Sequence, residues 1–292
     1  MLEETGNDII LGGVSSILTF NMSVTDRNAL VEVGDIPFQI MPSTNNFLST
    51  KSINDYIEMS NPKLLIHMNY ITKPFSISAV EINSKTRVNL RQYRILSDRL
   101  GTKNILIHTP DSEDEYINTG YGMKIIHDEL IKYGKIIHFE LPVFSLDLQR
   151  LLGAEKSSDP IPKHIHMYMN KLMKYLNVLP HGSWKLVIDT AHMWGNGCDE
   201  MQIINILEEY SKHIEYIHLN GNIKRMFSKD THAPIFSKSN LLPHDNLSKY
   251  ISSKHFICIC EITKEGAEWK DWEAYASKYN LTLVPFNHKF SY

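Results

Sequence analysis

The 292-residue sequence has few cysteines, no long apolar run and no strong excess of either charge. Its three cysteines form no disulfide framework, because Cys258 and Cys260 are two residues apart in one apolar segment and poorly placed to bridge each other. No stretch approaches the roughly 20 apolar residues of a membrane span. The acidic N-terminus MLEETGNDII lacks the basic start and apolar core of a signal peptide. We therefore expect a chain that is neither secreted nor bound to a membrane, in a reducing compartment such as the cytoplasm.

The charge balance excludes a large basic footprint. A formal net charge of −3 and an isoelectric point near 6.5 are not typical of a protein that binds nucleic acid through its overall charge. Bound divalent cations would add local positive charge that the sequence does not count, so this exclusion does not extend to a metal-containing site. The sequence also lacks a G-x-G-x-x-G fingerprint near its first apolar segment, LGGVSS, which argues against an open sheet that binds a dinucleotide.

Apolar segments alternate with helix-length stretches along the whole chain. We predict strands at 8–15, 34–41, 62–68, 102–108, 134–140, 184–190, 214–220 and 255–261. Helices are predicted at 79–100, 119–133, 164–177, 200–212 and 268–279, with weaker signals at 24–33, 52–60 and 245–253. Eight strand–helix repeats indicate an α/β fold, a single (β/α)₈ TIM barrel over residues 1–292. The polar segments 153–163 and 221–246 are predicted to be loops over the barrel mouth.

Six of the predicted strands end in a residue type that binds metals. The segments KLLIH, ILIH, KIIHFE, LVID, YIH and ICICE end at His67, His108, Glu140, Asp189, His218 and Glu261. The carboxyl ends of the strands form the face that holds the active site in barrel enzymes, so these side chains should meet there. A single histidine at a strand end is usually structural, but six strands ending in this way predict a metal site.

Two short motifs add further ligand types to this set. Asp189 and His192 lie three residues apart in DTAH, and Asp230 and His232 frame the segment DTH in a long loop. The resulting nine imidazoles and carboxylates suit zinc, and also manganese or iron. Nine ligands suit two or three ions better than one, because a catalytic zinc usually takes three protein ligands. The other histidines, including His164 and His166, are interpreted as structural.

The segment LVIDTAHMWGNGCD resembles a signature of the endonuclease IV family of apurinic/apyrimidinic endonucleases, in the xylose isomerase-like barrel superfamily. IHLNGN and DTH resemble two later signatures of that family. The resemblance implies three zinc ions, with manganese as an alternative at one position. The first would be held by His67, His108 and Glu140, the second by Glu140, Asp189, His218 and Glu261, and the third by His192, Asp230 and His232. It also implies catalytic roles for Glu261 and for the bridging Glu140.

The chain departs from the family pattern at several positions. It lacks the family's histidine in the first strand segment, and Thr231 and Gly221 replace an arginine and an acidic residue. The sequence is therefore identified as a divergent member, and its Ile-, Asn- and Lys-rich composition fits an AT-rich genome such as that of a large DNA virus. A viral member would act in the nucleus or the virion.

The resemblance also implies contacts with DNA. Tyr70 and Ile71 follow ligand His67 and correspond to the family's apolar wedge, which helps to turn the abasic nucleotide out of the helix. The remaining DNA contacts are expected from Gln39 and Asn45 in a second loop and from Lys224, Arg225 and Lys229 in the long loop. Packing of Tyr70 under its own loop, and solvation of the basic residues, are the alternatives.

The expected function is hydrolysis of the phosphodiester 5′ to abasic sites in double-stranded DNA by a monomer, with 3′-end repair activity. The alternative is a metal-dependent sugar isomerase or epimerase of the xylose isomerase-like barrels. That reaction would use Glu140, Asp189, His218 and Glu261 alone and leave the other five ligand types without a role. A DNA-binding remnant without activity is disfavoured, because all nine ligand types are present.

Overall fold

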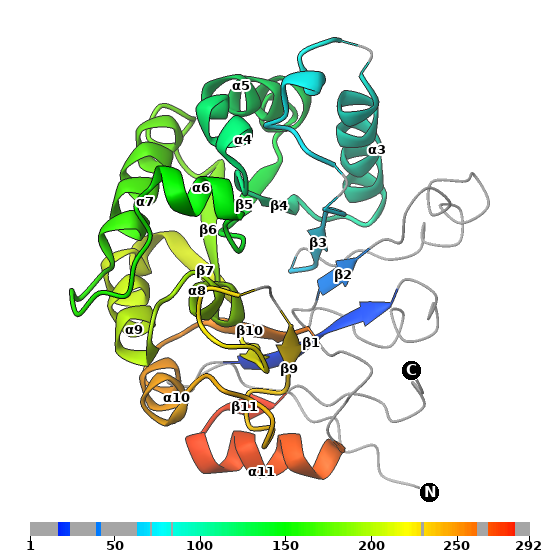
Figure 1. The fold of residues 1–292 in the computed structure, drawn as a ribbon. Helices are drawn as coiled ribbons and strands as arrows, with labels where there is room; N and C mark the ends of the chain where they lie inside the picture. The colour runs from blue at the N-terminus through cyan, green and yellow to red at the C-terminus, as the bar shows by residue number, and fades with distance from the viewer. Residues whose placement is uncertain are drawn as a thin grey trace, which may run out of the picture.

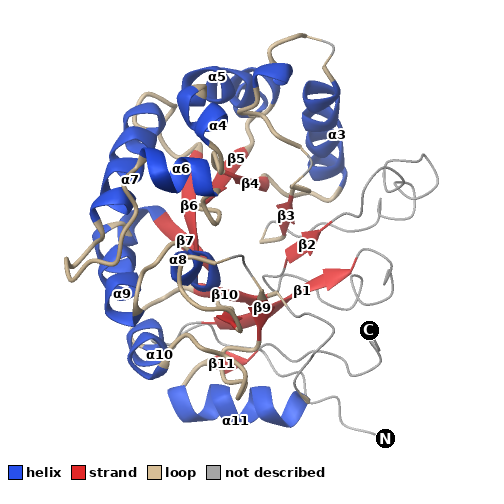
Figure 2. Cartoon of the chain, viewed as in Figure 1, coloured by secondary structure: helices blue, strands red, loops and turns tan. Residues whose placement is uncertain are grey.

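The computed structural model describes residues 17–23, 39–41, 63–70, 72–82, 84–228, 231–261 and 268–283. Within these residues the chain forms a ring of eight parallel strands with helices on its outside (Figures 1 and 2). The strands are β1 (Ile17–Ser23), β2 (Gln39–Met41), β3 (Leu65–His67), β4 (Asn104–His108), β5 (Ile136–Glu140), β6 (Trp184–Asp189), β7 (Ile214–His218) and β10 (Ile257–Cys260). Each strand pairs with the next, and the pairing of β10 with β1 closes the ring. The predicted TIM barrel is confirmed.

The first strand is not where the sequence pattern placed it. The predicted segment 8–15 lies outside the described residues, and β1 is formed by the later segment ILTFNMS, which begins at Ile17. The barrel sheet has one further short strand, β11 (Thr282–Leu283), which also pairs with β1.

The helices agree with the predicted alternation. The main ones are α3 (Lys85–Arg99), α5 (Thr119–Glu129), α7 (Lys163–Leu176), α9 (Glu200–Glu209), α10 (Asp245–Ser252) and α11 (Trp269–Tyr279). Shorter helices are α4 (Glu113–Ile117), α6 (Leu146–Leu151) and α8 (Thr190–Gly195), with 3-10 turns at Ile77–Ala79, Ile131–Tyr133 and Ser211–His213. The predicted helices at 24–33 and 52–60 lie outside the described residues. None of the described helices is long and apolar enough to cross a membrane.

The start of α3 differs from the prediction. The helix was expected from residue 79, but it begins at Lys85 after the separate turn Ile77–Ala79. Ser84 explains the position, because its hydroxyl accepts a hydrogen bond from the Arg87 amide and caps the helix.

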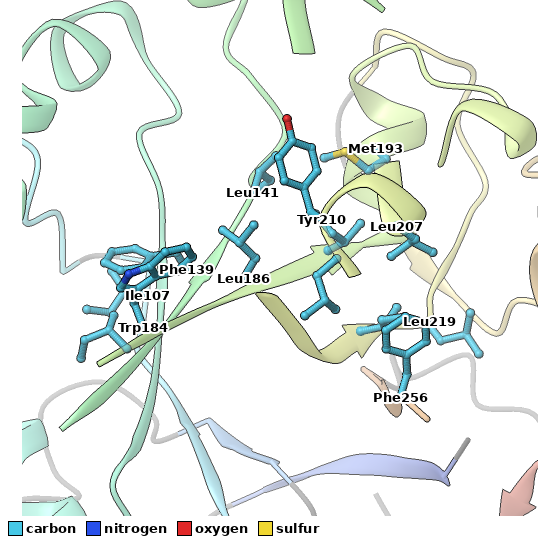
Figure 3. Packing of buried hydrophobic residues seen from close by; sticks show 14 of the residues in the cluster. Ile107, Phe139, Leu141, Trp184, Leu186, Met193, Leu207, Tyr210, Leu219 and Phe256 are labelled. Atoms are coloured by element: carbon cyan, nitrogen blue, oxygen red, sulfur yellow. The ribbon is translucent and has the colours of Figure 1, made fainter. Parts of the chain in front are cut away.

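Two hydrophobic layers hold the barrel together. The larger lies between the strands and the surrounding helices, where residues such as Phe139, Leu186 and Leu207 interlock (Figure 3). The smaller fills the barrel interior with Leu65, Leu106, Val187, Tyr216 and Ile259. Full burial of one such side chain stabilises the fold by about 1.5–3 kcal/mol.

The inner layer sets the position of the site. Side chains alternate along a strand, so a residue two positions after an inward-facing one also faces inward. His67, His108, Asp189, His218 and Glu261 each stand two residues beyond one of the five interior residues. The barrel floor is therefore apolar, and the next layer toward the carboxyl ends of the strands carries the ligand types.

Part of the long segment 221–246 forms a hairpin. Its residues Gly221–Asn222 (β8) and His232–Ala233 (β9) form a small antiparallel sheet apart from the barrel. This pairing brings His232 back to the barrel mouth.

Candidate metal centre

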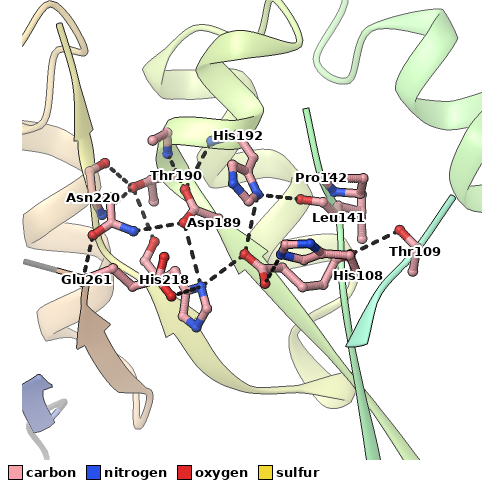
Figure 4. Close-up of polar contacts among 12 residues, drawn as sticks. His108, Thr109, Leu141, Pro142, Asp189, Thr190, His192, His218, Asn220 and Glu261 are labelled. Atoms are coloured by element: carbon pink, nitrogen blue, oxygen red, sulfur yellow. Dashed lines mark hydrogen bonds and ion pairs between the residues drawn. The ribbon is translucent and has the colours of Figure 1, made fainter. Parts of the chain in front are cut away.

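Glu140 at the end of β5 lies at the centre of the site. Its carboxylate is fully buried, with His108 Nε2 3.0 Å and His67 Nε2 3.3 Å from Oε2. On the other side, His218 Nδ1 lies 2.9 Å from Oε1 (Figure 4). His192 Nδ1 is 3.3 Å from the same Oε1, so four histidines surround one carboxylate.

A second group of ligands is built around Asp189. This residue ends β6 and caps α8, since its Oδ1 accepts hydrogen bonds from the amides of Ala191 at 2.6 Å and His192 at 3.0 Å. The cap fixes the first turn of α8 and so directs the His192 side chain toward the barrel mouth (Figure 4). His232, from the hairpin, places Nε2 3.5 Å from Asp189 Oδ2 and Nδ1 3.1 Å from Glu261 Oε2.

The structure brings together eight of the nine predicted ligands. They form four overlapping groups whose ligand atoms lie within 4.8 Å of one another: His67–His108–Glu140, His67–His218–Glu261, Glu140–Asp189–His218 and Asp189–His192–His232. Asp230, the ninth, lies outside the described residues. The four groups share members, so they form one continuous cluster of potential metal ligands.

The chemistry of these residues fits bound divalent metal. Glu140 Oε2 is buried and has no hydrogen-bond partner, although two imidazole nitrogens lie within 3.3 Å of it. Nitrogens and an oxygen that converge without hydrogen-bond geometry are arranged as ligands of a common ion would be. Imidazole and carboxylate are the ligand types of zinc sites.

The charges of the site stabilise one another. Burial would raise the pKa of the Glu140 carboxyl, but the neighbouring His218 and His108 hold that pKa well below its ordinary value. Burial would likewise lower the pKa of His218, yet Glu140 and Glu261 raise it well above its ordinary value.

Backbone carbonyls and buried amides orient the ligands. His67 Nδ1 lies 2.8 Å from the Met68 carbonyl, and His192 Nδ1 lies 2.8 Å from the Leu141 carbonyl. A carbonyl can only accept, so each Nδ1 donates and the ring presents Nε2 as its metal-binding atom. Asn220 donates to Asp189 Oδ2 at 2.8 Å and accepts from the Glu261 amide at 2.9 Å. Asn220 is not among the predicted site residues, although its place two residues after His218 was a usable signal.

The predicted DNA-contacting residues have three outcomes. Tyr70 is 70% exposed on the turn after β3, and Lys224 and Arg225 are exposed in the loop between β8 and β9, so all three are accessible. Ile71, Asn45 and Lys229 lie outside the described residues.

The prediction for Gln39 is wrong. This residue lies within β2 and is fully buried, so it cannot reach DNA. Its side chain is hydrogen bonded to Glu261 and His218, at the floor of the site.

His164 is structural, as predicted. It is buried in α7 and donates from Nε2 to the Asn196 carbonyl at 2.8 Å. Burial, which disfavours the charged ring, lowers the pKa of His164.

No protein-family model and no curated protein matches this sequence. Solved structures do match the fold. A D-tagatose 3-epimerase-like protein is 14% identical, with 90% of this chain and 98% of that chain covered and a TM-score of 0.62. Endonuclease IV from Thermus thermophilus is 14% identical over 90% of this chain and 99% of that one, with a TM-score of 0.58. The IolI protein with a bound zinc atom is 12% identical over 90% and 96%, with a TM-score of 0.55. What these structures share with the chain is the TIM-barrel fold.

Proposed function

We propose that the chain is a zinc-dependent endonuclease that hydrolyses the phosphodiester 5′ to abasic sites in duplex DNA. The observation that supports this most is the number of converging ligands. Glu140, Asp189, His218 and Glu261 would be enough for one ion, but four more histidines surround them. Clusters of metal ions are typical of enzymes that displace a leaving oxygen from a phosphodiester.

The ligands divide in the way that the family resemblance implies. One ion would be held by His67, His108 and Glu140, and another by Glu140, Asp189, His218 and Glu261. The third would be held by His192 and His232 together with Asp230. Bound zinc would supply positive charge that neutralises the phosphodiester, and it would lower the pKa of water so that hydroxide is available near neutral pH.

The protein groups would orient the reactants. Glu261 would accept a hydrogen bond from the attacking water and align its oxygen with phosphorus. Its own carboxylate is held by Gln39, whose amide nitrogen lies 2.8 Å from Oε1. As the new bond between oxygen and phosphorus forms, the bond to the 3′-oxygen breaks. The attacking water would give up one proton through Glu261, and the leaving 3′-oxygen would take up one from solvent, so that the products are a 3′-hydroxyl and a 5′-deoxyribose phosphate.

The rim of the barrel offers groups for DNA. Tyr70 stands three residues beyond His67 and is 70% exposed, so its ring can reach a base step. With Ile71 it would form the apolar wedge that unstacks the duplex. Lys224 and Arg225, exposed on the loop that leads to His232, would meet phosphates. An abasic nucleotide has no base pair to break, which makes its extrusion cheap and selective. The protein would act as a monomer, and would also trim blocked 3′ ends.

A duplex with a single abasic analogue tests this proposal. The wild-type protein with zinc should nick the strand 5′ to the lesion, and a chelator should abolish the nicking. His232→Ala should lower the rate by at least about 100-fold, equivalent to about 2.7 kcal/mol. His166→Ala is the matched control, because His166 is an exposed histidine of α7 away from the site. Nicking that survives both the chelator and His232→Ala would contradict the proposal.

A sugar isomerase or epimerase is the second candidate. Among the three structures compared, the epimerase-like protein has the highest TM-score. Sugar isomerisation or epimerisation on this chain would need only Glu140, Asp189, His218 and Glu261. Metal analysis separates the two, since about one ion per chain favours sugar chemistry and about three favour the nuclease. The nuclease is preferred because sugar chemistry gives His67, His108, His192 and His232 no role.

A further inference from the structure

Gln39 is a fully buried amide at the floor of the candidate metal centre. Its Nε2 lies 2.8 Å from Glu261 Oε1, and its Oε1 lies 2.9 Å from His218 Nε2. We infer that Gln39 is a positioning residue, which holds the ring of His218 and the carboxylate of Glu261 in their metal-binding states. This inference rests on the metal centre of the proposed function and is independent of its DNA substrate.

The contact of Gln39 with Glu261 fixes the orientation of its amide, and this orientation sets its contact with His218. A carboxylate only accepts hydrogen bonds, so the amide nitrogen of Gln39 must be the group that faces Glu261. The amide oxygen then faces His218 Nε2, and because this oxygen also only accepts, Nε2 must carry a hydrogen. Reversing the amide would set two acceptors against each other at Glu261.

The fixed hydrogen on Nε2 leaves Nδ1 of His218 as the metal-binding nitrogen. Nδ1 faces the carboxylates of the site, with Glu140 Oε1 at 2.9 Å, Asp189 Oδ2 at 3.6 Å and Glu261 Oε1 at 3.7 Å. The nitrogen on the side of the other ligands is thus the one with a lone pair to give. With the opposite tautomer, Nδ1 would present a hydrogen to that space and could not bind a cation.

The strand that carries Gln39 is held on both sides. In β2, Gln39 is paired in register with Asn21 of β1 and with Leu65 of β3. Its partners are remote in sequence, at separations of 222 residues for Glu261 and 179 for His218. An amide is also uncharged, so it satisfies both partners without adding a charge to a cluster of three carboxylates. An apolar residue would leave the buried donor and acceptor without partners.

Zinc affinity tests the inference without any DNA. We expect Gln39→Leu to weaken zinc binding at one site about 10- to 100-fold, the usual effect of losing a group that orients a ligand. The affinity would be measured by competition with a chromophoric chelator on the full chain. Asn104→Leu is the matched control, since the Asn104 amide accepts from His138 Nε2 at 3.2 Å in the same barrel, at the amino-terminal ends of the strands. It should leave zinc affinity unchanged.

The tautomer of His218 provides a second measurement. Nitrogen-15 NMR of the zinc-loaded wild type should show a hydrogen on His218 Nε2, with the signal assigned by its loss in His218→Gln. Gln39→Met, which keeps the length of the side chain, should weaken zinc binding like Gln39→Leu and make the Nε2 hydrogen exchange faster with water. This variant serves if the leucine variant does not fold.

The outcomes separate this inference from the proposed function. If Gln39→Leu and Gln39→Met both bind zinc as tightly as the wild type, the role of Gln39 is overturned and the metal centre stands. A hydrogen on Nδ1 of His218 in the loaded wild type would do the same. Wild-type protein that binds no zinc would overturn the metal centre itself, and the inference with it.

Discussion

Replacing Gly197 by alanine should destabilise the protein more than an ordinary glycine substitution. Gly197 lies just after α8 with φ of 88°, a left-handed conformation that costs an L-residue roughly 1–2 kcal/mol. An added Cβ would also stand 2.1 Å from Cζ of Phe227, whose ring fills that space. Overpacking of this kind costs typically about 1–3 kcal/mol. The sum is a loss of about 2–5 kcal/mol in the free energy of unfolding.

The loop that carries Phe227 links this perturbation to the site. Phe227 lies between β8 and β9 and itself has φ of 59°. The same loop continues to His232, whose ring approaches Asp189 and Glu261. Displacing the Phe227 ring should therefore shift His232. Gly197→Ala should then lower the zinc content of the protein as well as its free energy of unfolding.

Gly134→Ala provides the control, because Gly134 has φ of 76° with nothing within 4 Å of an added Cβ. It should show only the backbone cost, of about 1–2 kcal/mol. Thermal unfolding measures the difference in stability between the two variants. A loss of 1 kcal/mol lowers Tm by about 2–4 °C in domains of roughly 150–250 residues, and the shift should be similar or slightly smaller here. The double variant Gly197→Ala/Phe227→Ala should regain the part of the stability loss that the clash with the Phe227 ring causes. Equal losses in Gly197→Ala and Gly134→Ala would refute this account of the packing.

Three other perturbations have defined outcomes. Glu129→Gln should lower the free energy of unfolding at pH 7 by about 1.5 kcal/mol, the value of a charge-assisted hydrogen bond. The Arg91 hydrogen bond lowers the pKa of Glu129 below 4.5 despite its burial, so this contribution is present above pH 4.5. The difference from wild type in urea unfolding should shrink as the pH falls through the lowered pKa; a constant difference would contradict the assignment. Tyr70→Ala should weaken binding to abasic duplex about tenfold, or about 1.4 kcal/mol, while zinc content stays unchanged; loss of zinc would mean a structural role. Removing zinc with a chelator should lower Tm, because each site held at 100 times its Kd adds about 2.7 kcal/mol; an unchanged Tm would indicate that no zinc was bound.

The residue pattern alone was enough to predict the barrel. Apolar runs of strand length, each followed by a helix-length stretch, identified seven of the eight barrel strands at their described positions. The eighth, β1, was misplaced because two short apolar segments near the N-terminus compete, and only pairing with β2 and β10 distinguishes them. Pairing between strands at opposite ends of the chain has no local signal in a sequence.

The candidate site was predictable for a geometric reason. Parallel strands in a ring all end on one face, so any side chain that ends such a strand must lie near the others there. Strand ends alone therefore placed His67, His108, Asp189 and His218 together. His192 followed from the same logic, as it lies one helical turn beyond Asp189.

Only the tertiary structure decided which of these residues contact one another. It placed Glu140 among four histidines and brought His232 to Asp189 through a hairpin. It also moved Gln39 from an expected DNA contact to the buried floor of the site. The sequence by itself determined which residue types reach the mouth of the barrel, because strand length and alternation are local properties. Which oxygen faces which nitrogen depends on register and side-chain packing across the closed ring, and those are fixed only when all eight strands are in place.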